Sequence, residues 1–514
     1  MDTLKIEITP EVDRFQASQD EINVLVTIKA PFQDIIKRTP CDLVCCVDIS
    51  GSMTPNMELL IQTLLFVVEQ MSENDRLCVV TFSTDVRVLV PFTYMDGASK
   101  MAAVEACKSL GSENSTFLSG GLFMSCDEML KAIIQDRVSS SSVFLLTDGE
   151  ATDGMTSLSE IVSVLKNRKF TQNYTSLPTL PNNVPRAPCL FGYQRYTPNS
   201  AQNSSVTETV ETDVDLPFRI STFGFGSTHN ETLLRGIAQS GKGMYTYIQT
   251  HKTLTAAFAD ALGGLLSTTA QNINCKISCP DTFKIESVNG GQSVSETGNN
   301  FTTRFTDLQS EERRDLIVKL RRETTVAAPS TVSLIDVNVE YKNMLHTNAT
   351  ETVSCSYSVQ FDTEEGLSKT PAQRSVEFDI QMMRLQVASA LIEANRLAAN
   401  DRMAACAHLR TYSTQVSDMI ERNPSMQCKS LEADLNQAID SIATQSHSVA
   451  SKTMTSLSMQ HYQQRSSTTS AMPSVYTTPH KTAVISSSQG HNGISQRSVS
   501  SPPNLTQKDE PDDV

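Results

Sequence analysis

Three oxygen-bearing side chains stand close together in the segment Asp48-Ile49-Ser50-Gly51-Ser52. A carboxylate and two hydroxyls are hard oxygen donors, which suit Mg²⁺, Mn²⁺ or Ca²⁺ better than zinc or copper. Gly51 permits a positive φ, so a tight turn with this spacing can direct all three oxygens at one centre. The alternative interpretation is the end of a strand followed by ordinary helix-capping serines.

The element that must position this segment is the apolar run at residues 43–47, which ends at Asp48. A short apolar run bounded by glycine and polar residues is typical of a buried strand, and burial on both faces fits the middle of a parallel sheet. A helix-like segment follows from about Asn56. The strand therefore brings its donors to the edge of the sheet where open α/β folds bind ligands.

Two later segments carry further oxygen donors. Residues 142–149 (S-V-F-L-L-T-D-G) form a second apolar run ending in Asp148, and residues 115–122 form a polar loop that leads into a helix. In this order the three segments resemble the metal-ion-dependent adhesion site of a von Willebrand factor type A domain. The resemblance implies one divalent cation, Mg²⁺ or else Mn²⁺ or Ca²⁺, bound by Asp48, Ser50, Ser52, Thr116 and Asp148. The family loop often reads G-G-T-N, whereas residues 114–117 read N-S-T-F.

Composition and charge argue against several classes of protein. The 514 residues include 57 acidic and 42 basic side chains, a formal net charge of −15, which disfavours nonspecific binding to nucleic acid or to an anionic membrane. No apolar run reaches the length of a membrane span, and the first residues lack the apolar core of a signal peptide. The twelve cysteines form no C-x-x-C pair, as expected of buried thiols in a reducing compartment. We therefore expect a cytoplasmic protein.

Hydrophobic periodicity predicts an α/β domain inserted in a β-sandwich. Residues 41–265 alternate strands with helices, which is typical of a doubly wound α/β domain, and residues 171–216 interrupt it with five prolines, which indicates a flexible insertion. Residues 1–37 and 268–362 show the period-2 alternation of antiparallel strands. The few N-terminal strands cannot form a core alone, so we predict that both segments share one sandwich. This part loosely resembles the sandwiches that flank such domains in integrin β subunits.

The last part of the chain changes to helical periodicity. The apolar stripes of residues 376–446 predict a small three-helix packing unit. Residues 447–514 are rich in Ser, Thr and Gln with few large apolar side chains, which predicts a disordered tail. A helical region after the sandwich resembles the tail of plant proteins that pair this domain with RING fingers.

These features favour a non-enzymatic adaptor that captures an Asp or Glu of a protein partner at the metal site, because five protein oxygens leave a position open on a six-coordinate cation. One alternative is a metal-dependent hydrolase, which needs an acid–base group or nucleophile near the metal; the sequence contains no H-E-x-x-H, G-x-S-x-G or P-loop motif, and we assign no catalytic residue. The other is a substrate-recruiting component of a ubiquitin-ligase pathway, which follows from the plant resemblance although no RING cysteine pattern is present. The sequence specifies neither the partner nor the preferred cation.

Overall fold

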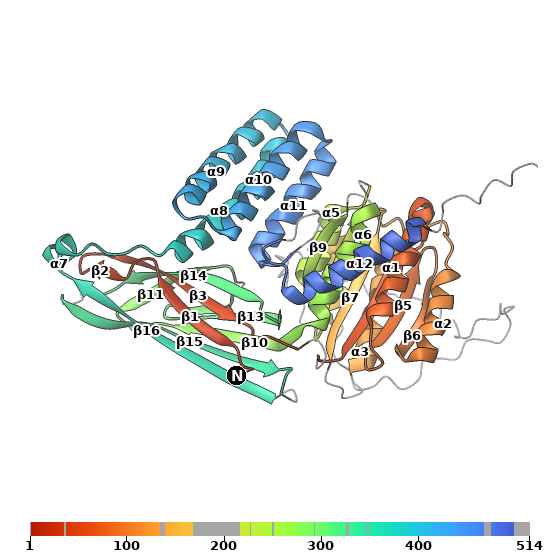
Figure 1. Cartoon of the computed structure of the whole chain (residues 1–514), viewed down its shortest axis with the longest axis horizontal. Coiled ribbons are helices and arrows are strands. Elements are labelled where there is room, and N and C mark those ends of the chain that lie inside the picture. The colour runs from red at the N-terminus through yellow and green to blue at the C-terminus, as the bar shows by residue number, and fades with distance from the viewer. Residues whose placement is uncertain are drawn as a thin grey trace, which may run out of the picture.

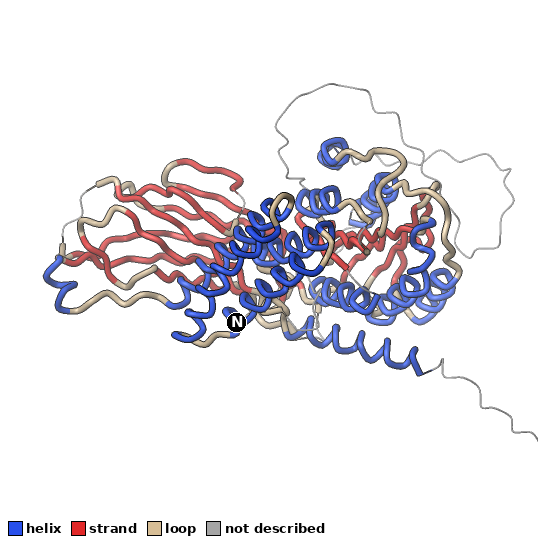
Figure 2. Tube along the Cα trace, turned by 90° about the horizontal axis from the view of Figure 1, so that it is seen from above, coloured by secondary structure: helices blue, strands red, loops and turns tan. Residues whose placement is uncertain are grey.

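The structure is a computed structural model that describes residues 2–34, 38–133, 139–167, 216–226, 228–248, 251–291, 293–324, 328–346, 349–466 and 474–497. An α/β domain and a β-sandwich lie end to end, with a bundle of helices over their junction (Figure 1). The view from above keeps the strands of these two bodies in separate groups (Figure 2). The predicted insertion at residues 171–216 lies, apart from Leu216, outside the described residues. No helix of the described chain is long and apolar enough to cross a membrane.

A six-stranded sheet forms the centre of the α/β domain. Its strands are β4 Cys41–Asp48, β5 Arg76–Phe82, β6 Val86–Tyr94, β7 Ser140–Thr147, β8 Arg219–Phe225 and β9 Lys242–Ile248. They lie in the order β6-β5-β4-β7-β8-β9, and only the edge strand β6 is antiparallel to its neighbour. The apolar run that precedes Asp48 is therefore a strand, β4, flanked on both sides, and all of its residues are buried.

Helices cover both faces of this sheet, as the doubly wound prediction requires. They are α1 Met57–Gln70, α2 Gly97–Lys108, α3 Leu118–Ile133, α4 Leu158–Asn167, α5 Glu231–Ser240 and α6 His251–Leu266, with a 3₁₀ turn, η2 Gly51–Asn56, before α1. Side chains of β4 alternate between two cores: Val44 and Cys46 pack with α3, α4 and α5, whereas Leu43, Cys45 and Val47 pack with α1, α2 and α6. This alternation is the period-2 geometry of a strand buried on both faces.

Two sheets form the β-sandwich. The strands are β1 Lys5–Pro10, β2 Arg14–Gln16, β3 Glu21–Lys29, β10 Thr268–Ser278, β11 Phe283–Asn289, β12 Ser293–Thr297, β13 Asn300–Gln309, β14 Arg313–Arg322, β15 Ser330–Asn343 and β16 Ala349–Asp362. One sheet has the order β1-β3-β14-β11 and the other β12-β13-β10-β15-β16-β2. The N-terminal strand β3 pairs with β14, which follows the α/β domain in the chain. The α/β domain is thus inserted in the sandwich, as predicted.

The helical region contains α7 Glu364–Lys369, α8 Val376–Ala398, α9 Arg402–Arg422, α10 Met426–Thr444, α11 His447–Gln463 and α12 Pro479–Arg497. Helices α8 to α11 share one core, which includes Leu391, Leu409, Leu435 and Leu457. Each of these four helices begins after a serine or aspartate whose side chain accepts a hydrogen bond from the first turn, the usual N-terminal cap. Residues 376–446 therefore form the three predicted helices, α8 to α10, and α11 adds a fourth helix to their core.

Helices α11 and α12 correct the predicted start of the disordered tail at residue 447. Met454 and Leu457 of α11 face the bundle core, whereas Met459 packs in the core of the α/β domain. In α12, Val484 packs against Phe66 of α1 and Ala259 of α6. The prediction from composition was wrong because the few apolar side chains of this segment pack into the bundle and against the α/β domain. The segment therefore needs no core of its own.

Candidate functional site

The carboxyl ends of the adjacent parallel strands β4 and β7 bring the two aspartates of the predicted site together. The last aligned pair of these strands is Val47 with Leu146, so Asp48 follows on one strand beside Thr147 on the other. The Thr147 hydroxyl donates a hydrogen bond to Asp48 Oδ2. Asp148 is the next residue of the chain, and both carboxylates are buried.

The turn after β4 directs the two serines towards Asp148. The Ser50 amide donates to Asp48 Oδ1 (2.8 Å), which folds the chain back over the strand end. Ser50 Oγ and Ser52 Oγ are 3.0 Å apart, and Ser52 Oγ donates to Asp148 Oδ1 (2.7 Å). The D-x-S-x-S spacing therefore places its side-chain oxygens in one contiguous set. The alternative of a helix-capping serine does not hold for Ser50, because its side chain accepts no hydrogen bond from a backbone amide of η2.

The third loop brings Thr116 to the same place. The Glu113 amide donates to the Ile49 carbonyl (2.6 Å), and the Thr116 carbonyl accepts from the Thr152 amide (3.1 Å), so this loop is bonded to the loops after both β4 and β7. A Cβ atom placed on Gly149 would lie 3.4 Å from Ser52 Oγ and 3.7 Å from Thr116 Oγ1. The two hydroxyls thus face the same small space although the loop sequence departs from G-G-T-N.

Burial gives both carboxylates unusual proton affinities. Desolvation raises the pKa of Asp48 to about 6, against the hydrogen bonds from Thr147 and Ser50, and the charge of Asp148 adds to the rise. Desolvation also raises the pKa of Asp148. Neither carboxylate forms an ion pair with a lysine or arginine of the described chain. Two buried acids and three hydroxyls without a neighbouring cation are the donor set that fits a hard divalent metal ion.

Two positioning residues were not predicted from the sequence. Asn56 Nδ2 donates to Asp148 Oδ2 (3.2 Å), and the Thr228 hydroxyl donates to the Asp148 carbonyl. Asn56 stands four residues after Ser52, one helical turn along the chain, which is a signal that spacing could have supplied. Thr228 precedes α5, and no local pattern connects it to Asp148.

His229, near this edge of the sheet, belongs to the core. It is 3% exposed, its Nε2 lies 2.8 Å from the Tyr245 hydroxyl, and burial lowers its pKa to about 4. Its imidazole is therefore held neutral between buried neighbours. Among the described residues no cluster of three or more His, Cys, Asp or Glu side chains could hold a metal ion. The arrangement can bind a cation through aspartates and hydroxyls.

Comparison with known sequences identifies the family of the α/β domain. Residues 42–260 match the family model of the von Willebrand factor type A domain. The protein sll0103 of Synechocystis is 22% identical over 409 residues, which cover 77% of this chain and 82% of that protein. The probable E3 ubiquitin-protein ligase WAVH2 of Arabidopsis thaliana is 22% identical over 436 residues, 82% of this chain and 50% of that protein. YfbK of Escherichia coli is 26% identical over 239 residues, 46% of this chain and 33% of that protein, so this chain spans a third to a half of two of these relatives.

Two solved structures share the fold of most of the chain. The von Willebrand factor type A protein from Catenulispora acidiphila covers 89% of this chain and 96% of its own, with a TM-score of 0.60 and 14% identity. The ArnB paralog VWA2 from Sulfolobus acidocaldarius covers 88% and 98%, with a TM-score of 0.52 and 11% identity. At these identities the similarity establishes the fold, and its extent shows that it reaches beyond the α/β domain.

Proposed function

This chain contains a von Willebrand factor type A domain, and from that premise we propose that it is a non-enzymatic protein-binding adaptor that needs a divalent cation. Domains of this family commonly bind proteins and are generally not catalytic. The cation would be Mg²⁺, or else Mn²⁺ or Ca²⁺, and its ligands would be Asp48, Ser50, Ser52, Thr116 and Asp148, which we call the cation site.

One observation carries the proposal. Two buried carboxylates and three hydroxyls converge at one sheet edge, and the carboxylates have no lysine or arginine partner among the described residues. Leaving two buried acids uncompensated is costly, and oxygen donors of this kind prefer hard divalent cations. The same set contains no residue suited to act as a general base, since its only ionisable members would be ligands.

The partner's contribution follows from charge. A bound divalent cation supplies a strong local positive charge on an acidic protein. The two carboxylates offset the charge of the cation, so the net charge of the occupied site is close to zero and does not repel an incoming Asp or Glu. The other three ligands are neutral hydroxyls, so the cation can still accept one anionic ligand. We therefore propose that a partner's acidic side chain completes the site.

Calorimetric titration of Mg²⁺ and Mn²⁺ into the full chain tests the ligand set. Wild type should bind one ion, and Asp148→Ala should bind none. Asp153→Ala is a matched control, because Asp153 is an exposed carboxylate on the same loop and its side chain accepts a hydrogen bond from the neighbouring Gly154 amide (2.8 Å). Equal binding by wild type and Asp148→Ala would contradict the proposal.

The partner can be sought by proximity labelling with wild type and Asp48→Ala side by side. Proteins labelled by wild type alone are candidates, and each should be released by a chelator and by changing one of its Asp or Glu residues to the amide. A partner that stays bound after both treatments, to protein shown to be folded, would contradict capture by the cation.

A second candidate function is recruitment of substrates in a ubiquitin-ligase pathway. The match to the Arabidopsis protein named as a probable ubiquitin ligase covers 82% of this chain but only half of that protein. This chain would then act by binding and not by transferring ubiquitin. Co-purification with a ubiquitin ligase, lost in Asp48→Ala, would support this role, and a partner set without ligase components would count against it.

We further propose that the protein works in the cytoplasm. The eleven cysteines in the described chain form no disulfide with one another, and ten of them are buried. Burial raises the pKa of several of these thiols, Cys107 to about 12 for example, which keeps them protonated and unreactive. Reporter fusions that locate the chain in an oxidising compartment would contradict this.

A further inference from the structure

A cavity of about 150 Å³ lies where the three parts of the molecule meet. The α/β domain contributes Lys242 to its wall, the sandwich contributes Arg304, Asp307 and Arg314, and the end of α11 with the following turn contributes Tyr462 and Arg465. The charged side chains of the wall are thus four cations and one carboxylate, in a protein whose net charge is −15.

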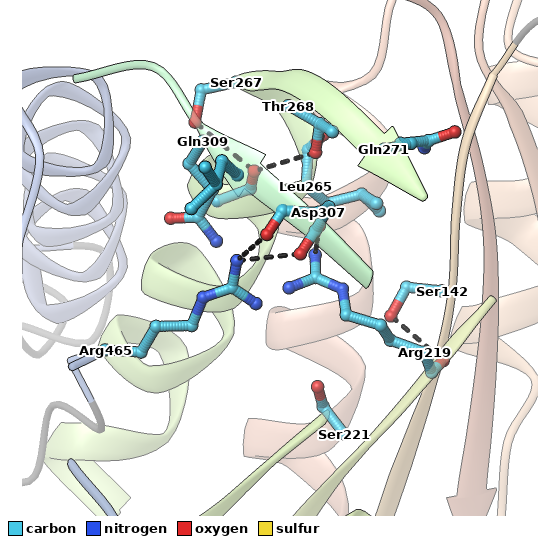
Figure 3. A network of polar contacts seen from close by, with 12 residues as sticks. Ser142, Arg219, Ser221, Leu265, Ser267, Thr268, Gln271, Asp307, Gln309 and Arg465 are labelled. Atoms are coloured by element: carbon cyan, nitrogen blue, oxygen red, sulfur yellow. Dashed lines mark hydrogen bonds and ion pairs between the residues drawn. The ribbon is translucent and has the colours of Figure 1, made fainter. Parts of the chain in front are cut away.

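Asp307, Arg314 and Arg465 of this wall belong to a buried cluster of charged side chains. Arg219 and Arg465 approach Asp307 from opposite sides (Figure 3), each with a nitrogen 2.7 Å from a carboxylate oxygen. Arg465 also pairs with Glu312 (2.8 Å), and so does Arg314 (2.7 Å). These contacts join β8 of the α/β domain, β13 and β14 of the sandwich, and the chain that leaves α11.

Lys481 and Asp260 extend this cluster to α12 and α6. Lys481 Nζ lies 3.5 Å from Asp260 Oδ2 and donates to Ser466 Oγ (3.0 Å), which itself donates to Asp260. We call the whole set the junction cluster: Arg219, Asp260, Asp307, Glu312, Arg314, Arg465 and Lys481. All seven residues are less than a tenth exposed. Among these described residues four cations face three carboxylates, so the set carries one positive charge more than it has carboxylates to offset it.

Arg314 is the member of the junction cluster whose side chain is least well satisfied. This residue is 7% exposed, and its Nε finds no hydrogen-bond acceptor among the described residues. Burial, with repulsion from Arg465 and Arg219, lowers its pKa to about 10 against the attraction of Glu312. Arg314 is paired with Glu312, but a buried donor without an acceptor is costly, and so is an excess of buried positive over negative charge. Arg314 also lines the cavity.

We propose that this cavity is a binding site for a small, multiply charged oxyanion of the phosphate type. Such an anion would offset the surplus charge of the junction cluster and meet Lys242 and Arg304, which line the same cavity. Arginine forks match the oxygens of phosphate. Because the wall draws on all three parts of the molecule, the anion would also hold them in one arrangement. This inference is independent of the cation site.

The test is calorimetric titration of pyrophosphate into the full chain, without divalent cations and at constant ionic strength set by chloride. Wild type should bind one pyrophosphate, and pyrophosphate should raise its temperature of thermal unfolding. The double variant Lys242→Asn with Arg304→Gln removes two cations of the wall and leaves the junction cluster intact. It should bind at least tenfold more weakly.

The substitutions Lys242→Asn and Arg304→Gln are chosen so that the variant can still fold. Lys242 has a φ of 54°, a left-handed conformation that asparagine tolerates, and Arg304 is exposed. The matched control is Lys276→Gln, an exposed cation of the neighbouring strand β10, which should bind pyrophosphate as wild type does. The proposal would be overturned if wild type did not bind pyrophosphate, or if wild type and the double variant bound it with equal affinity. If the double variant is unfolded, Arg304→Gln alone replaces it and should bind pyrophosphate severalfold more weakly than wild type.

Discussion

The cation site and the junction cluster both bury carboxylates, but they compensate the charge differently. At the junction, burial alone would raise the pKa of Glu312, and Arg314 and Arg465 lower it to about 2. At the cation site, burial raises the pKa of Asp48 to about 6 because its hydrogen-bond donors, Thr147 and Ser50, are neutral. The protein supplies its own cations in one place and leaves two carboxylates without them in the other.

The charges of the junction cluster stabilise the fold, whereas we propose that those of the cation site bind a ligand. A carboxylate that is paired within the chain contributes to the folded state whatever the solution contains. Carboxylates left without a partner gain one only when an ion arrives, so their contribution depends on the concentration of that ion. The two regions should therefore respond to different perturbations.

The largest effect is expected from Arg465→Met. It leaves Asp307 with Arg219 alone and Glu312 with Arg314 alone, and breaking a buried ion pair costs about 3–5 kcal/mol. Chemical denaturation should show this loss in the free energy of unfolding. Arg321→Met is the control, because Arg321 is half exposed and its pair with Glu323 spans 3.4 Å; such surface pairs contribute about 0–1 kcal/mol. Similar losses in the two variants would mean that the junction cluster does not hold the domains together.

Acid should weaken the junction through Glu312. Its pKa falls from 4.5 to about 2 on folding, so its contribution is complete above pH 4.5 and is lost as the pH falls towards 2. The loss amounts to roughly 3 kcal/mol. In Glu312→Gln the free energy of unfolding should fall less steeply over this interval than in wild type. Parallel curves for the two proteins would show that this ion pairing is not the source of acid sensitivity.

Thr116→Ala should weaken Mg²⁺ binding about tenfold and leave the stability of the metal-free chain nearly unchanged. A hydroxyl that contacts a charged group contributes about 1.5 kcal/mol, and the Thr116 side chain makes no hydrogen bond that the described fold depends on. Ser115→Ala, one residue earlier, should bind Mg²⁺ as wild type does. A Thr116→Ala protein with unchanged Mg²⁺ affinity would remove this hydroxyl from the cation site.

The smallest predicted effect is that of Gly149→Ala. The added methyl would lie at ordinary contact distance from the Ser52 and Thr116 hydroxyls, so the fold should lose less than about 0.5 kcal/mol. The methyl would nevertheless occupy space between ligands of the proposed cation, and Mg²⁺ affinity should fall severalfold. Gly97→Ala, which meets no atom within 4 Å, is the control. If both alanine variants bind Mg²⁺ like wild type, the space beside Gly149 is not where the ion sits.

Sequence patterns predicted the parts that depend on local order. The run before Asp48 is a strand because its residues are apolar on both faces, and the loops that follow adjacent parallel strands must meet at one edge. The junction cluster could not be predicted in this way. Arg465 and Asp307 are 158 positions apart, and neither belongs to a motif. Helix α11 was missed for a related reason, since its burial depends on surfaces that other segments supply.

The most direct test of the account is thermal unfolding of wild type, Asp48→Asn and Asp153→Asn, each with Mg²⁺ and with a chelator in its place. An ion that binds only the folded chain stabilises it by an amount that grows with its concentration. We predict that Mg²⁺ raises the unfolding temperature of wild type and of Asp153→Asn, and that the temperature of Asp48→Asn is the same in both solutions. An equal rise in all three proteins, or no rise in wild type, would contradict the claim that the cation site is completed by a divalent ion.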